Sequence, residues 1–500
     1  MAVGASVAAD YALLFRRFDD YTADDYKAER SGVHRRAAAW MLWLARAHGG
    51  IYVKAAQHIA GLVYIVPAEL TDTLKVLQDR APFRPLDAMR PVLLEDFAVA
   101  NVHDLFAEFS DLPIAAASLA QVHRAVTRDG QEVAVKIQYP DVARLFDVDM
   151  TTLQTLSSLI AAAFPDFQLE WVAKEFRKNL IQEFDFTNEA KNCEMTAARF
   201  AYRAADVRCP EIRWDLTSRR VLTMEFIHGV KVNNVPAIRS LGLDPADVRS
   251  VLSQAFAEMI FCHGVLHCDP HPGNAFIVRS PARPDKPQLV ILDHGLYRYI
   301  SDEFRLLYCQ LWKALVLGDV ALLRDVSARL GVPQYADYFP LIFTNRVMGS
   351  ASLLGESVSK EDRARLRQQF KDTTLAQVLV FLESLPREIL LASRVSNLIR
   401  GIHQELGGEN IERFSDNATY AILGSYFSTS KPVRDALTAE RLDTRGAARS
   451  RVVAFQLTAR IDSFTDRIRF WRDLAWLRVR LWLGQSFVLT LRWLRSWNLA

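Results

Sequence analysis

The residues best suited to chemistry lie in the short segment from His267 to Asn274. An apolar, helical stretch breaks there into an Asp, two prolines and a glycine, and Asn274 follows five residues after Asp269. Enzymes that transfer phosphoryl groups as protein kinases do use an Asp to orient the attacking hydroxyl and an Asn five residues later to hold a metal ion. The same residue types also gather in ordinary turns, so the spacing alone is a weak signal.

A second acidic residue follows at the end of a predicted strand. Gln288–Leu292 is an apolar run typical of a buried strand, and it leads to Asp293 in a turn that contains a glycine. Kinases carry a metal-binding Asp at the corresponding place. Two carboxylates and one amide, from Asp269, Asn274 and Asp293, therefore predict a magnesium site for nucleotide phosphates.

The elements that must position these groups include a small sheet upstream. After an alanine-rich loop, the sequence predicts strands over Gln121–Thr127 and Glu132–Gln138, joined by an Asp-Gly turn. Lys136 lies among apolar residues in the second strand. It is either an edge-strand gatekeeper or the phosphate-binding lysine of a Val-Ala-Ile-Lys strand, and the Asp-x4-Asn spacing downstream favours the lysine of a kinase.

Kinases hold this strand lysine with a glutamate from a helix. Helices are predicted over 141–163 and 168–200, and the second contains Glu183, our predicted partner for Lys136, with Glu189 as the alternative. A charged, solvated helix face would explain either acid equally well.

Two further predicted strands, Val207–Ile212 and Arg220–Ile227, lead into a polar link. Such a link, between a small lobe with a sheet and a helical lobe, is where adenine usually binds. Glu225 and Ile227 are therefore predicted to contact the nucleotide through their main chain. An amphipathic helix over Pro245–Gly264 then positions the turn that carries Asp269.

The first hundred residues predict an α-helical extension, with a helical region over 35–70. Lys54 and Gln57 stand three residues apart and share a helix face, although a solvated pair opposite an apolar face would look the same. The region after Asp293 is helical again. Its predicted helices are Asp302–Gly318, Val320–Leu330, 335–350, 361–372, 374–385 and 387–405. No Ala-Pro-Glu element follows Asp293, which predicts that the peptide-docking segment of ordinary protein kinases is absent.

Composition limits the classes of protein. The chain has 500 residues, which suggests two or more domains, and its 50% hydrophobic and 24% charged content fit a folded protein with a large core. A formal net charge of +3 gives no support for nucleic-acid binding. Five cysteines without a Cys-x-x-Cys pair favour a reducing compartment. Five Asp residues between positions 10 and 25 make the first thirty residues unlike an organelle transit peptide.

The predicted last helix, about 449–500, alternates arginine with apolar residues. From Arg467 to Ala500 there are seven Arg against one Asp, and five of the ten Trp. Its longest charge-free run, Leu481–Leu491, is eleven residues, whereas a membrane span needs about 20. Both a helix lying in a membrane interface and a helix packed on the core fit this pattern.

Taken together, these motifs resemble the UbiB family of atypical kinase-like proteins, also called aarF-domain-containing kinases, and most of all its eukaryotic aarF-domain-containing kinase 1 branch. The likeness runs from about residue 30 to about 420. Its most specific element is the His-x-Asp-Pro-His-Pro-Gly-Asn string of residues 267–274. The other elements are Lys54-Ala55-Ala56-Gln57, Ala115-Ala116-Ala117-Ser118, Val133-Ala134-Val135-Lys136, Glu183-Phe184-Asp185 and Asp293-His294-Gly295.

The resemblance implies an α+β fold: a bilobal, protein-kinase-like fold with a helical N-terminal extension and a helical C-terminal tail. The expected domains are the extension over 1–110, an N-lobe over 111–230, a helical C-lobe over 231–430 and a basic, Trp-rich tail over 431–500. In the family the extension covers the site where a protein substrate would otherwise bind.

The resemblance also implies a role for each motif residue. Lys54 and Gln57 become gating residues, Lys136 the phosphate contact, and Asp269 the catalytic Asp. Asn274 and Asp293 become the Mg²⁺ ligands. The nucleotide loop would comprise Ile114, Ala115, Ala116, Ala117, Ser118, Leu119, Ala120, Gln121 and Val122.

The implied activity is ATP binding with Mg²⁺-dependent ATPase or phosphotransferase chemistry, linked to isoprenoid-quinone lipid metabolism or mitochondrial membrane homeostasis. The implied location is a mitochondrial membrane, or alternatively a plastid, with a lipid surface contacted through the C-terminal helix and with unidentified protein partners. A nucleotide-sensing pseudokinase scaffold that recruits lipid enzymes or membrane proteins is the alternative. A small-molecule kinase of the aminoglycoside or choline type is a third hypothesis, but those enzymes lack the Lys-x-x-Gln extension.

One position departs from the family pattern Lys-x-Gly-Gln, because Ala56 stands where the family has glycine. Glycine costs a helix about 1 kcal/mol relative to alanine, so this helix should be stiffer. We expect the methyl group to keep the extension from approaching the nucleotide site as closely as in the family.

Overall fold

A computed structural model describes residues 2–18, 20, 23–60, 66–78, 83–163, 170–344, 384–426 and 468–479. The chain divides into two compact units. The first unit comprises Met1–Glu194, Pro210–His228 and Asp293–Leu296, and the second comprises Met195–Cys209, Gly229–Leu292 and Tyr297–Ala500. The predicted α+β class is confirmed, because both units combine helices with a sheet.

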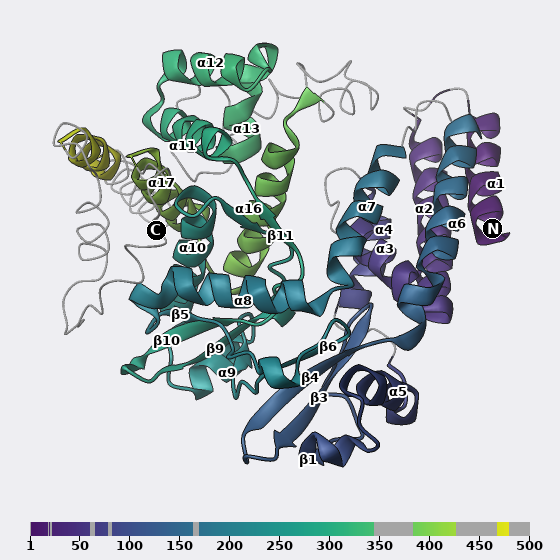
Figure 1. The fold of residues 1–500 in the computed structure, drawn as a ribbon. Coiled ribbons are helices and arrows are strands. Elements are labelled where there is room, and N and C mark those ends of the chain that lie inside the picture. Colours follow the sequence, from purple (N-terminus) through teal and green to yellow (C-terminus); the bar gives the residue numbers. More distant parts are fainter. Residues whose placement is uncertain are drawn as a thin grey trace, which may run out of the picture. The chain divides into compact units, whose positions relative to one another are not determined.

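The first unit begins with helices that pack against one another, and Figure 1 shows them in purple beside α6 and α7. Gly49 and Gly50 end α2 and start α3 at positive φ values of 67° and 49°, which glycine adopts without steric cost. The predicted helical region 35–70 is therefore interrupted. The helices are α1 (Ala2–Arg17), α2 (Asp24–His48), α3 (Gly50–Ala60), α4 (Ala68–Leu74), η1 (Lys75–Gln78), α5 (Leu86–Phe97), α6 (Pro140–Ala163) and α7 (Glu170–Glu183).

The sheet of the first unit is antiparallel, with strand order β1-β3-β4-β6 and with β2 paired to β3. The predicted strands over 121–127 and 132–138 are confirmed as β3 and β4. The strands are β1 (Phe106–Phe109), β2 (Ala115–Ala116), β3 (Ala120–Thr127), β4 (Glu132–Gln138) and β6 (Val221–Glu225), with short helices η2 (Val102–Asp104) and η4 (Trp214–Leu216) between them.

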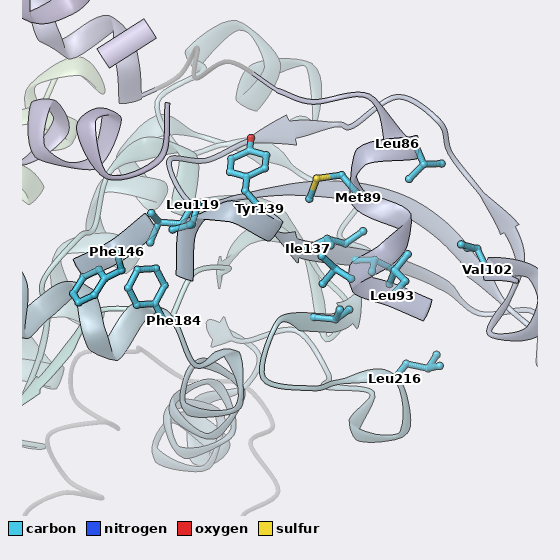
Figure 2. Packing of buried hydrophobic residues seen from close by; sticks show 14 of the residues in the cluster. Leu86, Met89, Leu93, Val102, Leu119, Ile137, Tyr139, Phe146, Phe184 and Leu216 are labelled. Atoms are coloured by element: carbon cyan, nitrogen blue, oxygen red, sulfur yellow. The ribbon is translucent and has the colours of Figure 1, made fainter. Parts of the chain in front are cut away.

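One face of this sheet packs against α5 and the start of α6 to form the core in Figure 2. Ile137 of β4 is fully buried there beside Met89 and Leu93 of α5. Phe146 of α6 and Phe184 meet edge to face with ring centroids 5.0 Å apart. This core fixes the strand that carries Lys136.

The predicted helix over 168–200 is wrong, because the chain breaks at residues 184 and 185. Helix α7 ends at Glu183 and a separate helix, α8, covers Phe186–Phe200. The Asp185 carboxylate accepts hydrogen bonds from the Thr187 backbone N–H at 3.0 Å and from its hydroxyl at 2.6 Å, as a helix N-cap does. Asp185 thereby starts a new helix in a new direction.

The second unit holds a four-stranded sheet in the order β5-β10-β9-β7 and a two-stranded pair, β8 with β11. The predicted strand over 207–212 is only two residues long, and Ile212 makes an isolated bridge to Met224. The strands are β5 (Val207–Arg208), β7 (Val230–Lys231), β8 (Val265–His267), β9 (Ala275–Ser280), β10 (Arg283–Ile291) and β11 (Tyr297–Tyr299).

The helices of the second unit surround α10 (Pro245–Phe261), whose side chains from Ala255 to Phe261 are all buried. It packs against α17, α16 and α11. The remaining helices are η3 (Ala201–Arg203), α9 (Val235–Ser240), η5 (Pro272–Asn274), α11 (Asp302–Leu317), α12 (Val320–Arg329), η6 (Pro333–Tyr338), α13 (Phe339–Thr344), α16 (Arg387–Glu405) and α17 (Asn410–Tyr426).

Only part of the predicted C-terminal helix is described. Residues 468–479 are helical, and Phe470 and Leu477 are buried, while Trp471 and Trp476 are 41% and 54% exposed. Asp473 pairs with Lys313 and accepts a hydrogen bond from the Tyr426 hydroxyl. The predicted helix over 361–372 and nearly all of that over 374–385 lie outside the described residues. Among the residues that the structure describes, no helix is long and apolar enough to span a bilayer.

Candidate phosphoryl-transfer site

Lys136 is the centre of the site in the first unit. Its strand, β4, lies between β3 and β6, so Lys136 pairs with Val122 on one side and Leu222 on the other. The ammonium Nζ donates to both carboxylate oxygens of Glu189, at 2.7 and 3.0 Å, and to Asp293 Oδ2 at 3.1 Å. Because β4 pairs with a strand on each side, it is not an edge strand, and the edge-strand alternative for Lys136 is excluded. Lys136 is also only 9% exposed and is bound to two acids.

The charges of this cluster are strongly coupled. Burial alone would lower the pKa of Lys136, but the Asp293 and Glu189 carboxylates raise it above its ordinary value. Burial would raise the pKa of Asp293, yet Lys136, the Gly295 N–H and the charge of Lys54 hold it well below its usual range. Asp293 is therefore ionised and Lys136 protonated at neutral pH.

Glu189 differs from Asp293 because its side chain is only 4% exposed. Burial raises its pKa to about 7, against the opposing effect of Lys136. The neighbouring Asp293 carboxylate acts in the same direction as burial, since two like charges share one cation.

The predicted pairing of Lys136 with Glu183 is wrong, and the alternative, Glu189, is the partner. Glu183 forms an ion pair with Lys54 instead, with Nζ and Oε2 2.7 Å apart. The break at Asp185 places the two glutamates on different helices, so each reaches a different lysine. The N-cap residue types Asp185 and Thr187 are the sequence signal that could have located this break.

The extension contributes Lys54 from α3. Its side chain is 18% exposed, and the Glu183 partner is 11% exposed, so the pair is largely buried. Gln57 lies one turn further on and donates from Nε2 to the Leu77 carbonyl at 2.8 Å. Gln57 thus links α3 to η1 within the extension. The positive charge of Lys54, in contrast, helps to lower the pKa of Asp293.

Ala56 also faces the interior of the extension. It is 4% exposed and packs in a cluster with Ala45 of α2, Leu74 of α4 and Leu77 of η1. The expectation that its methyl group holds the extension away from the nucleotide site is therefore wrong. The methyl group instead packs between helices of the extension.

The alanine-rich loop, Ile114–Val122, is a tight hairpin. The Ile114 N–H donates to the Val122 carbonyl and the Ala117 N–H donates to the Ala120 carbonyl, both at 2.8 Å. Only small residues lie at the narrow end, apart from Leu119, whose side chain is buried in the core. The Gln121 side chain is fully buried and bonds to both main-chain groups of Arg84 and to His123, so it anchors the hairpin.

The predicted adenine link begins at the end of β6. The Glu225 N–H donates to the Glu211 carbonyl at 2.8 Å, and the Phe226 N–H donates to the Glu132 carbonyl at 3.2 Å. Ile227 follows and is 9% exposed. The link is thus fixed by main-chain hydrogen bonds to its neighbours.

The second unit brings Asp269 and Asn274 together. After β8, the Asn274 side-chain Nδ2 donates to the Asp269 carbonyl at 3.1 Å, and the Asn274 carbonyl accepts from the Leu292 N–H at 2.9 Å. A Cβ on Gly273 would lie 2.8 Å from the His271 ring, so a larger residue there would force this ring to move.

The donor set fits Mg²⁺, which prefers carboxylate and amide oxygens. Asp293 offers an ionised carboxylate whose side chain is 32% exposed, and Oδ1 accepts from the Gly295 N–H at 3.0 Å. A Cβ on Gly295 would lie 3.3 Å from Asp293 Oδ1 and 3.4 Å from Glu189 Oε2, so glycine leaves room for both carboxylates.

Comparison with known proteins identifies a matching family and several relatives. Residues 76–327 match the model of the ABC1 atypical kinase-like domain. The chain is 40% identical over 435 residues to the probable serine/threonine-protein kinase abkD of Dictyostelium discoideum, covering 86% of this chain and 61% of that relative. It is 38% identical over 405 residues to AarF domain-containing protein kinase 1 of Xenopus tropicalis, covering 81% and 76%.

Among solved structures, Rv3197 of Mycobacterium tuberculosis, in complex with erythromycin, aligns with 79% of this chain and 100% of its own. The TM-score is 0.48 and the sequence identity is 19%.

Proposed function

The chain belongs to the ABC1 atypical kinase-like family, and on that premise we propose that it is a Mg²⁺-dependent ATPase or phosphotransferase. The fold is protein-kinase-like, and the kinase-named relatives support a kinase-type enzyme. The observation that carries the proposal is the buried Lys136, held by Glu189 and Asp293. A strand lysine held by a helix-borne glutamate is the arrangement that kinases use to hold nucleotide phosphates.

Each residue has a proposed task. Lys136 binds phosphate oxygens of ATP, and Glu189 orients it. Asp269 orients a water or small hydroxyl for in-line attack on the γ-phosphate. Asn274 and Asp293 would hold Mg²⁺, which supplies charge neutralisation for the phosphates.

The proposed remaining contacts belong to the hairpin of residues 114–122, to the main chain of Glu225 and Ile227, and to Lys54 and Gln57 as gating residues. Gln57 would gate only indirectly, since its amide bonds to the Leu77 carbonyl within the extension. Lys54 would act through its charge, which reaches Asp293.

We further propose a role in isoprenoid-quinone lipid metabolism or mitochondrial membrane homeostasis. The exposed Trp471 and Trp476 support contact with a lipid surface, because Trp prefers the depth of a membrane interface. No nucleic-acid partner is proposed.

The metal assignment is tested by Asp293→Asn. Losing the ionised carboxylate should abolish the Mg-ATP-dependent rise in melting temperature and reduce ATP turnover by orders of magnitude. Asp285→Asn, at an exposed position in β10, is the matched control and should behave like the wild type. A thermal shift with Mg-ATP that is unchanged in Asp293→Asn would refute the assignment.

The second candidate is a nucleotide-sensing scaffold with little turnover. One observation favours it: Asp293 Oδ2 already bonds to Lys136, so the metal ligand is engaged in an ion pair. ATP hydrolysis measured with and without anionic liposomes separates the candidates. Turnover that vanishes in Asp269→Asn supports the enzyme, whereas nucleotide-dependent partner capture that survives this change supports the scaffold.

A further inference from the structure

Gln121 and His123 are polar side chains buried in the apolar core of the first unit. Both belong to β3, and both are 0% exposed. They stand two residues apart, so they point to the same face of the strand. Their direct neighbours on β4 are Ile137 and Val135, which are part of that core. Burying polar groups there is unfavourable unless each of them finds a hydrogen-bond partner.

This face of the sheet is opposite to the one that carries Lys136. Residues that pair directly across two strands share a face, and Lys136 pairs with Val122. Val122 comes between Gln121 and His123, so its side chain points the other way from theirs. Any effect of Gln121 or His123 on phosphates held by Lys136 must therefore pass through the hairpin of residues 114–122.

The Gln121 amide is bonded to a peptide group outside the sheet. The Arg84 backbone N–H donates to Gln121 Oε1 at 2.9 Å, and Gln121 Nε2 donates to the Arg84 carbonyl at 3.0 Å. Arg84 lies two residues before the start of α5. Its guanidinium pairs with Asp141 of α6 at 2.7 Å and lies 5.0 Å from the centre of the Tyr139 ring. Gln121 thus joins the hairpin to a segment that is itself held by α6.

These bonds determine the protonation state of His123. A peptide N–H can only donate, so the amide oxygen of Gln121 faces the Arg84 N–H, and the amide nitrogen donates to its other partners. His123 Nε2 lies 2.9 Å from Gln121 Nε2 and is therefore an acceptor. The imidazole proton is then on Nδ1, which donates to the Ser110 carbonyl at 2.8 Å. His123 is thus neutral, in the Nδ1–H tautomer.

The surroundings of His123 favour this neutral form. Burial lowers its pKa, because the imidazolium would lose its hydration. The Ser110 carbonyl and the charge of Asp111 act in the opposite direction, but burial has the larger effect. The Phe109 ring packs beside the imidazole, with ring centroids 5.2 Å apart. A protonated His123 would turn an N–H towards the N–H donors of Gln121 and break this hydrogen bond.

We propose that Gln121 and His123 are positioning residues for the nucleotide hairpin of residues 114–122. Gln121 links the hairpin to the Arg84 peptide group, and His123 holds the Gln121 amide in the orientation that this link requires. Neither side chain contacts the nucleotide. Their role rests on the ATP binding proposed above, in which this hairpin contacts the nucleotide.

Hydrogen exchange of the full chain, without nucleotide, measures the link itself. The N–H groups of Ile114 and Ala117 donate to carbonyls across the hairpin, so their exchange reports its opening. We expect both groups to exchange at least about 10-fold faster in Gln121→Leu and in His123→Phe than in the wild type, because each variant breaks the chain of hydrogen bonds that holds the hairpin.

Two further variants separate this role from a general loss of packing. Thr127→Val removes a buried hydroxyl at the other end of β3, where Thr127 bonds to the main chain of Gln131. It should leave the exchange of the hairpin unchanged. His123→Gln offers one acceptor and one donor in place of the imidazole, so it should retain most of the protection that His123→Phe loses.

Steady-state ATP hydrolysis measures the consequence for the nucleotide. A hairpin that is held less firmly should bind ATP more weakly in the ground state and in the transition state alike. Gln121→Leu should therefore raise KM for ATP about 10-fold and change kcat by less than about 3-fold. Thr127→Val should match the wild type in both constants. A merely structural role of Gln121 would instead lower the active fraction, and with it kcat, at an unchanged KM.

Hairpin exchange in Gln121→Leu that matches the Thr127→Val control would overturn the proposal, and so would faster exchange with an unchanged KM. Should Gln121→Leu not fold, the comparison of His123→Phe with His123→Gln decides by the same two measurements. A wild-type protein that hydrolyses no ATP would refute the proposed function instead, and the exchange results would then decide whether the link holds the hairpin.

Discussion

At the scale of single residues, Lys136 shares its ammonium protons between two carboxylates that differ in exposure. Glu189 is 4% exposed and Asp293 is 32% exposed, so the buried acid fixes the lysine while the more exposed acid can turn to another cation. A second ion pair joins Lys54 to Glu183, and the charge of Lys54 also acts on Asp293.

Two matched substitutions distinguish the glutamates. Glu189→Gln should reduce ATP turnover by about 10²-fold, because Lys136 loses the group that orients it. Glu183→Gln removes the same charge six residues earlier but leaves Lys136 with both partners, so its effect should be less than about 10-fold. Steady-state ATPase assays measure both, and a larger loss in the Glu183 variant would contradict the assignment.

His403 predicts a pH dependence of stability. It is 2% exposed, and burial lowers its pKa to about 4 despite Glu412 nearby. Below about pH 6.5 the unfolded chain takes up a proton that the folded chain does not, so stability is complete above pH 6.5 and is lost as the pH falls to about 4. The loss amounts to at most about 3 kcal/mol.

Urea unfolding at pH 7.5 and pH 5 measures this loss. His403→Gln should show a smaller loss than the wild type, while His228→Gln, whose native side chain is 74% exposed, should match the wild type. Equal pH dependence in all three proteins would exclude His403 as the cause.

Which residues belong to the site could be inferred from spacing, but which of them pair could not. Asp-x4-Asn and the strand lysine are local patterns, and the structure does bring Lys136 and Asp293 into contact across 157 positions. The partner of Lys136 depends on a helix break and on the direction of the next helix. Both are set by tertiary structure. The charge pattern of residues 168–200 does not by itself distinguish Glu183 from Glu189 as the partner.

At the scale of secondary-structure elements, α3 is held by packing inside the extension. Ala56 is buried against α2 and α4, and Gln57 bonds to the carbonyl of Leu77. An alanine at position 56 therefore strengthens the extension itself, in addition to its higher helix propensity.

Ala56→Gly should destabilise the extension by about 1–2 kcal/mol, from about 1 kcal/mol of helix propensity and about 0.8 kcal/mol for the buried methyl group. Ala39→Gly, at an exposed position within α2, loses propensity alone and should cost about 1 kcal/mol. Hydrogen exchange of α3 and α2 amides gives both values. An equal or smaller loss at position 56 would mean that the methyl group contributes no packing.

Elements in which apolar residues repeat regularly could be predicted from the sequence. A helix break that depends on a single turn could not. Strands β3 and β4 alternate around an Asp-Gly turn, and their predicted ranges differ from the structure by at most one residue. The predicted helix over 168–200 missed a break that depends on one residue, Asp185, which caps α8.

At the scale of the whole molecule, the described part of the C-terminal segment agrees with the prediction of a helix packed on the core. Phe470 and Leu477 are buried on the core of the second unit, and Asp473 ties the helix to Lys313. The opposite face exposes Trp471 and Trp476. One face thus anchors the helix, and the other leaves two Trp side chains exposed for the lipid contact proposed above.

Replacing Trp471 and Trp476 with alanine should reduce co-sedimentation with vesicles that contain 20% anionic lipid by several-fold, because Trp side chains supply interfacial apolar area. Trp214→Ala is the control, since Trp214 is also 41% exposed but lies in the first unit. Unchanged sedimentation of the double variant would place any membrane contact elsewhere.

All five cysteines, Cys193, Cys209, Cys262, Cys268 and Cys309, are buried and unpaired by disulfides. Burial raises the pKa of the Cys309 thiol to about 12 and that of Cys262 well above its ordinary value, so neither forms a reactive thiolate at neutral pH. A maleimide dye should therefore label a single cysteine introduced on the surface without removal of the native five. Fluorescence reporters can thus be attached to the otherwise unmodified chain.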